Sequence, residues 1–236
     1  MSAITDILVD YLNIYVRYPA DSFSSKTSRK ARHYELMNWA KQEYQSTPNI
    51  DEIISFMRTN STLKYEQPFF LKVVTPCVQK DINEGRIESL RFLFECNGMN
   101  NHRIGTTIDY VNIFCLGTDY QYNAWDLADM VLSIEPDNQT VMYYKYISIL
   151  HFLDYSIHEV PMGVLSGIDS AEKEHMSGMN RNLREFITLS KKLGKNDENF
   201  ILKCTIIYAA WEQYLDNTQK YYSFEDYLVK HNLTYR

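Results

Sequence analysis

Apolar side chains recur along this chain at the spacing of an α-helix that buries one face, and this periodicity limits the possible folds more than any other feature. Intervals of three and four residues place side chains on one side of a helix. The clearest example aligns five large side chains: Phe200, Cys204, Ile207, Trp211 and Tyr214. Only 8 glycines and 6 prolines interrupt the 236 residues, too few turn-forming residues for a β-sandwich or barrel. We therefore predict an all-α fold.

The periodic stretches number about ten or eleven, and short connections join most of them. Short loops bring consecutive helices together as antiparallel neighbours. The pattern therefore predicts a multi-helix array or bundle of antiparallel helices, with a solenoid-like stack as one possible form. No low-complexity or charged linker divides the chain, so we expect a single helical domain over residues 1–236, with residues 117–122 as its one soft boundary.

The stretch 107–116 is compatible with both a helix and a strand. Its β-branched and aromatic residues suit a strand, whereas Ile108, Val111 and Cys115 share a helical face. We predict a helix, and we expect Gly117 to close the element in either case. Asn123 should cap the next helix, because a side-chain oxygen at that position accepts hydrogen bonds from free backbone N–H groups.

The segment Trp125–Asn138 is similar to the junction between consecutive tetratricopeptide repeats. In that family an alanine-bearing second helix leads to a proline, and the next helix begins just after it. The resemblance covers this one junction of about fourteen residues. Tyr143 and Tyr144 stand where the next helix of the family carries small residues, and no second copy recurs at the expected spacing. The resemblance implies a helix–turn–helix at this point and no ligand.

The formal net charge of −6 argues against a phosphate backbone as partner, because such binding requires clustered Lys and Arg. It favours a basic protein partner instead. No apolar stretch approaches the ~20 residues that cross a bilayer, so no membrane association is expected. The N-terminus lacks the pattern of a signal peptide, and the four cysteines form no CxxC pair. We therefore expect a cytoplasmic protein with reduced thiols.

Sequence motifs for nucleophilic catalysis and for phosphate loops are missing, so we expect no cofactor and favour binding over catalysis. One constellation supports the alternative. His151, Asp154 and His158 are spaced to share one stripe of a helix, and two imidazoles with a carboxylate are zinc ligands. The alternative function is therefore a helical enzyme, or a ligand- or metal-binding protein, with a pocket near these residues and the connection 159–168. A solvated polar helix face explains the same residues.

Core packing accounts for most of the 19 tyrosines, but they cannot all fit one buried face. Exposed tyrosines are favoured at protein interfaces because they bury a large area at low entropic cost. We therefore predict a protein-binding helical protein with an acidic, tyrosine-rich face. Six tyrosines are its candidate interface residues: Tyr120, Tyr122, Tyr143, Tyr144, Tyr221 and Tyr222. In size and charge the chain is similar to immunity and inhibitor proteins, which neutralise a basic toxin or effector.

Overall fold

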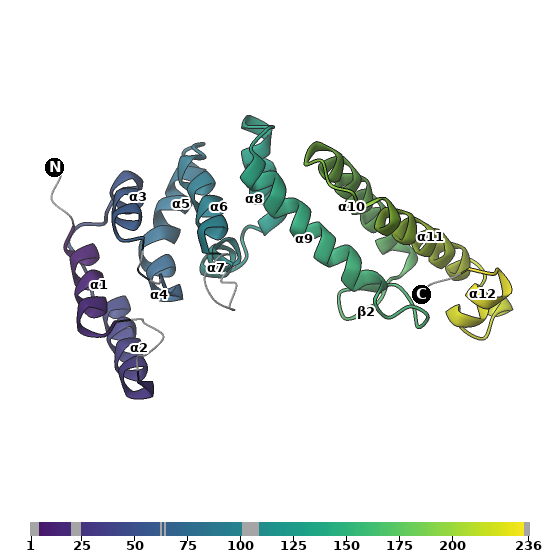
Figure 1. Ribbon diagram of the computed structural model, residues 1–236, viewed down its shortest axis with the longest axis horizontal. Coiled ribbons are helices and arrows are strands. Elements are labelled where there is room, and N and C mark those ends of the chain that lie inside the picture. Colours follow the sequence, from purple (N-terminus) through teal and green to yellow (C-terminus); the bar gives the residue numbers. More distant parts are fainter. Residues whose placement is uncertain (1–4, 20–24, 62, 64, 101–108, 234–236) are drawn as a thin grey trace. The chain divides into compact units, whose positions relative to one another are not determined.

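The computed structural model describes residues 5–19, 25–61, 63, 65–100 and 109–233, with the side chains of 97–100 outside the described set. The described chain is almost wholly helical (Figure 1), which confirms the predicted all-α multi-helix array. The strands that these residues form are limited to one two-stranded hairpin. The antiparallel order of the helices and a solenoid-like stack stay predictions.

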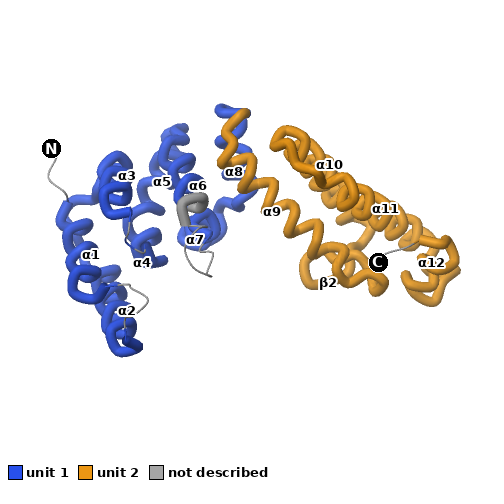
Figure 2. Tube along the Cα trace, in the orientation of Figure 1, with its two compact units in different colours: residues 1–136 blue, residues 137–236 orange. Residues whose placement is uncertain are grey.

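The chain divides into two compact units, residues 1–136 and 137–236, which Figure 2 shows in different colours. We call them unit 1 and unit 2. The division falls at Pro136, just before the cap of the following helix, and not in the expected soft region at 117–122. A single domain over 1–236 stays a prediction, because compactness alone does not show whether the units fold separately.

Unit 1 is built from short helices that pack against their neighbours in the chain. They are α1 (Asp6–Arg17), α2 (Lys26–Lys41), α3 (Ile50–Thr59), α4 (Gln67–Phe69), the π-helical turn η1 (Phe70–Val74), α5 (Thr75–Asn83), α6 (Glu88–Asn100), α7 (Tyr110–Gly117) and α8 (Ala124–Ile134). The N-terminal part of the core is aromatic, since Tyr11, Trp39 and Phe69 are fully buried with ring centroids 4.6–6.4 Å apart. Aromatic pairs at such distances add stabilisation beyond the area they bury.

A buried charge network fixes α2 against α1 and the chain before α4. Arg32 is only 7% exposed, and its Nε lies 3.2 Å from Oε1 of Glu66. The Tyr15 hydroxyl donates to the same carboxylate oxygen at 3.2 Å. Burial raises the pKa of Tyr15 well above its usual range. Removing Glu66 would leave the buried Arg32 without its counter-ion, and breaking a buried ion pair in this way typically destabilises a protein by about 3–5 kcal/mol.

Helix α7 confirms that the ambiguous stretch is helical where the structure describes it, from Asp109 onward; Ile108 lies outside the described residues. The Asp109 carboxylate accepts hydrogen bonds from the backbone N–H groups of Val111 and Asn112, at 3.0 and 3.1 Å. This side-chain cap satisfies donors that a helix start leaves free. The side-chain cap and the burial of Val111 and Phe114 therefore outweigh the strand propensity of the β-branched residues.

Unit 2 consists of longer helices and the hairpin. Its elements are α9 (Gln139–Ile157), β1 (Leu165–Ser166), β2 (Asp169–Ser170), α10 (Lys173–Lys192), α11 (Glu198–Leu215), the 3₁₀ turn η2 (Thr218–Lys220) and α12 (Phe224–Lys230). Helix α10 packs against both α9 and α11, and the antiparallel hairpin pairs Leu165 with Ser170. Within the described part of the chain, no helix has both the length and the apolar character needed to cross a bilayer.

Candidate functional site

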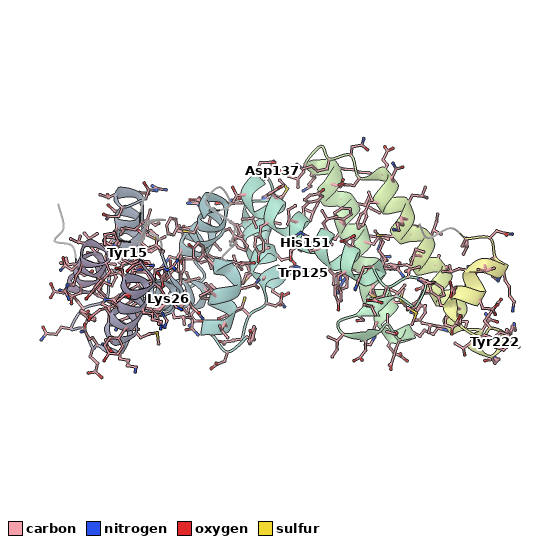
Figure 3. All side chains as sticks on the ribbon, turned by 60° about the horizontal axis from the view of Figure 1, so that its bottom comes forward. Tyr15, Lys26, Trp125, Asp137, His151 and Tyr222 are labelled. Atoms are coloured by element: carbon pink, nitrogen blue, oxygen red, sulfur yellow. The ribbon has the colours of Figure 1, made fainter. Side chains whose placement is uncertain are left out.

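The six candidate tyrosines lie in three different places. Tyr120 and Tyr122 precede α8 in unit 1, whereas Tyr143 and Tyr144 lie on α9 and the other two precede α12 in unit 2. Figure 3 labels Asp137, just before α9, and Tyr222, at the opposite end of unit 2. The tyrosines of unit 2 therefore do not form one continuous face.

Among the candidate tyrosines of unit 2, the two exposed rings each have a lysine of the same unit over one face. Tyr222 is 98% exposed, and the ammonium of Lys230 lies 5.9 Å from its ring centroid. Tyr143 is 46% exposed and has Lys195 at 5.1 Å. Cations over aromatic faces are attracted by the ring quadrupole. Tyr120, 71% exposed, has no aromatic or cationic partner of this kind among the residues that the structure describes.

The turn that carries Tyr120 closes α7 with a Schellman motif. The N–H of Tyr120 donates to the carbonyl of Cys115 at 2.8 Å, and the N–H of Asp119 donates to that of Leu116 at 3.1 Å. These two bonds satisfy carbonyls at the helix end, and the motif normally places glycine at its left-handed position. Here Asp119 and Tyr120 adopt φ of +49° and +56°. Bulky residues rarely adopt this region, and such outliers cluster at functional sites.

Gly117 does not supply this left-handed position; it is the last residue of α7, two residues earlier. A Cβ atom at Gly117 would meet Cδ2 of Leu71 at 2.7 Å and the side chain of Thr75 at 3.3 Å. A side chain at position 117 would therefore require the side chains of Leu71 in η1 and Thr75 in α5 to shift. The expectation that Gly117 closes the element is confirmed, and the left-handed residues that follow are Asp119 and Tyr120.

Hydrogen bonds and a ring contact anchor the turn to α7. The Thr118 hydroxyl donates to the carbonyls of Phe114 and Cys115, at 3.1 and 3.0 Å. The ring of half-buried Tyr122 stacks on Phe114 with centroids 5.8 Å apart. Burial raises the pKa of the Cys115 thiol to about 11, so this thiol stays neutral near pH 7. Tyr120 is thus exposed, like its neighbours Asp119 and Gln121, on a turn that Thr118 and Tyr122 anchor to α7.

Acidic side chains follow the turn on the outer side of α8. Asn123 caps α8 as predicted, with its side-chain oxygen 2.9 Å from the N–H of Asp126. Asp126 and Asp129 are exposed and three residues apart, so they share a face opposite buried Leu127. We call the set Asp119, Tyr120, Tyr122, Asp126 and Asp129 the α7–α8 surface.

The sequence around the α7–α8 surface is acidic and contains no basic residues, a feature that the prediction of the site did not use. Residues 104–144 contain six acidic residues and no Lys, Arg or His. Several of the six have structural partners: Asp109 caps α7, Glu135 pairs with Arg91 at 2.8 Å, and the Asp126 carboxylate accepts a hydrogen bond from the Asn123 amide. Asp119 is missed by the sequence analysis, and Tyr120 is not set apart there from the other five candidate tyrosines, since positive φ at non-glycine residues has no sequence signature here.

The alternative site does not assemble. His151 and Asp154 on α9 and His158 at its C-cap are all exposed, and Figure 3 labels His151. The His158 ring engages the Tyr155 carbonyl through Nδ1 and lies 3.2 Å from Glu159 through Nε2. Among the residues described, no group of three or more His, Cys, Asp or Glu is placed to hold a metal ion.

No family model, no curated protein and no solved structure matches this chain. Helix α8 ends before Pro136 and α9 begins after it, which is the order of elements that the tetratricopeptide resemblance implies. Membership of that family has no further support.

Proposed function

We propose that the protein is a binding module whose α7–α8 surface recognises a basic protein. The observation that carries this proposal is Tyr120, held outward at positive φ by an anchored turn and followed by exposed carboxylates. A rigid tyrosine loses little entropy when it is buried in an interface. Carboxylates around it steer a cationic partner and select against acidic ones.

The finer form of the proposal is an immunity- or inhibitor-type protein that neutralises a basic toxin or effector. Its support is the size and net charge of the chain, together with the run of acidic residues without basic ones between 104 and 144. In this form the partner presents Lys or Arg around a pocket that accepts the Tyr120 ring. Tyr and Arg are the residue types that most often dominate such interfaces.

The test compares two tyrosine variants of the full chain. The immobilised wild-type protein is first used to recover basic proteins from the native cell. The partner that is recovered stoichiometrically is then purified. Its association rate with the wild type should fall as salt is raised, because steering by charge is screened. Tyr120→Ser should weaken its binding by roughly tenfold or more, as expected for a hot-spot residue.

Tyr222→Ser is the matched control, because Tyr222 is even more exposed but lies in unit 2 outside the α7–α8 surface. It should leave the affinity unchanged. Equal losses in the two variants, or an association rate that does not respond to salt, would contradict the proposal. Recovery of an acidic partner alone would do the same.

A further inference from the structure

A groove of about 600 Å³ runs along the N-terminal half of α10 in unit 2. Phe152 of α9 and the largely buried Met179 supply apolar lining, and Ser166 of β1 contributes a hydroxyl. His151, Asp154 and His158 do not line it. Small-molecule sites typically have volumes of ~300–1,000 Å³ with an apolar lining and a few polar groups. The groove therefore has the size of a small-molecule site.

Two guanidinium groups give the groove its charge. Arg181 and Arg184 both line it and are exposed, and their spacing on α10 places them as neighbours on one face. Neither forms an ion pair with any residue in the described part of the chain. Glu174 is the one carboxylate in the lining against these two cations. Arginine presents several N–H donors in a fixed fork that matches the oxygens of phosphate or carboxylate.

His175 adds a further donor to the lining. Its Nδ1 accepts a hydrogen bond from the backbone N–H of Glu172 at 3.1 Å, as part of the capping box that starts α10. In the neutral ring the proton must then reside on Nε2. The Glu-x-x-His spacing at 172–175 thus serves the helix start, and His175 lines the groove as an N–H donor.

Gly178 is the feature that packing within the chain does not explain. It lies inside the 20-residue helix α10, where glycine is less favourable than alanine. A Cβ at Gly178 would have no atom within 4 Å, whereas one at Gly163 would meet Trp211 at 3.0 Å. Gly178 also lines the groove. Glycine commonly occurs where a ligand approaches the backbone closely, and that role accounts for the missing side chain.

We propose that this groove binds a small molecule carrying a phosphate monoester. The phosphate lies between Arg181 and Arg184, and the organic body passes over Gly178 against Phe152. Two neighbouring guanidinium groups match a dianion with three free oxygens better than a single carboxylate. Glu174 then accepts a hydrogen bond from a hydroxyl or amino group of the body. The site lies in unit 2 and is independent of the α7–α8 surface.

Isothermal titration calorimetry on the full chain tests the site with four compounds: AMP, ribose 5-phosphate, inorganic phosphate and succinate. At least one of the two phosphate esters should bind, inorganic phosphate should bind more weakly because it lacks the organic body, and succinate should bind least. Arg181→Gln with Arg184→Gln should weaken binding of the ester by about tenfold or more, since hydrogen bonds to charged groups are lost. Lys191→Gln with Lys192→Gln is the control, on the same helix but outside the groove, and should change little.

Gly178→Ala separates a ligand role from a structural one. It should raise the thermal midpoint of unfolding, because alanine favours the helix and has open space here. It should also weaken binding of the ester several-fold. Unchanged affinity in this variant, equal losses in the two double variants, or tighter binding of succinate would overturn the proposal. So would the absence of ester binding at millimolar concentration to wild type with a native circular dichroism spectrum.

Discussion

Helices α7 and α10 end in the same hydrogen-bonding motif but place different residues at its left-handed position. In α10 the N–H of Gly194 donates to the Lys191 carbonyl at 3.1 Å, and the N–H of Lys195 donates to that of Ser190 at 2.9 Å. In α7 the same two bonds start from Asp119 and Tyr120. Gly194 has φ of +62° and bears no side chain that could clash.

The difference suggests that the end of α10 has only a structural role, whereas the end of α7 also exposes a side chain. The left-handed region costs most L-residues roughly 1–2 kcal/mol, and glycine avoids this cost. Helix α10 follows that rule. Helix α7 instead uses its glycine for packing against Leu71 and holds Asp119 and Tyr120 in the unfavourable region. Such strain persists only where surrounding contacts enforce it, which points to a use for the exposed ring of Tyr120.

The largest effect on stability is expected at the C-terminal end of α10. Gly194→Val should lower the free energy of unfolding by about 2 kcal/mol, because a β-branched residue is forced to φ of +62°. Gly194→Asn is the matched control and should cost less, since asparagine visits this region more readily. Urea denaturation followed by circular dichroism measures both. Equal costs would mean that the left-handed backbone of this end is not the cause.

A second contrast concerns the residue whose carbonyl accepts the hydrogen bond from the N–H five positions later in the chain. This residue is Cys115 in α7 and Ser190 in α10. Burial raises the pKa of Cys115 from 9.0 to about 11, whereas the Ser190 hydroxyl donates to Asp197 at 2.7 Å and does not titrate. Between these pKa values the unfolded thiol loses its proton and the folded thiol keeps it. Stability from this group is therefore full below pH 9 and is lost as the pH rises toward 11.

The loss from Cys115 should amount to about 1 kcal/mol at pH 10. Cys115→Ser should remove that part of the alkaline destabilisation, whatever its own cost at neutral pH. The measurement is the free energy of unfolding of both proteins at several pH values between 7 and 10. Parallel pH profiles for the variant and the wild type would show that this thiol does not titrate as its burial implies.

A substitution in the turn after α7 should stabilise the protein. Tyr120→Gly should raise the free energy of unfolding by about 0.5–1 kcal/mol, because the relief of φ +56° exceeds the added freedom of the unfolded chain. It should also abolish the tyrosine-dependent part of partner binding. Gains in stability at the expense of function are typical of strained functional residues. A destabilised variant would indicate that the Tyr120 ring supports the fold.

The sequence was sufficient for the features that depend on local chemistry. Helical periodicity predicted the all-α class, and Asn123 was recognised as a cap because side-chain acceptors before a helix have a distinct pattern. The buried stripe of α9, from Met142 to Ile157, follows from spacing alone. The helical state of α7 was ambiguous because propensity and periodicity disagreed, and tertiary burial decided between them.

The candidate site was predicted only in part. Tyr120 and Tyr122 were included among the interface candidates, but four further tyrosines were grouped with them that lie elsewhere. Spacing along the chain does not show which elements meet, and the role of Gly117 depends on Leu71, which is distant in sequence. The groove along α10 was missed for the same reason, because its lining combines α9, β1 and α10.

The smallest effect on stability is expected from Asp119→Asn. Because the fold should hardly change, this variant isolates the role of the Asp119 charge in the turn after α7. Asparagine tolerates φ of +49° as well as aspartate does, so the free energy of unfolding should change by less than about 0.5 kcal/mol. Only the charge is lost. If the α7–α8 surface steers a basic partner, the association rate should fall and its dependence on salt should become shallower, while the dissociation rate changes little. A change confined to the dissociation rate would place Asp119 in direct contact with the partner and assign the steering to Asp126 and Asp129.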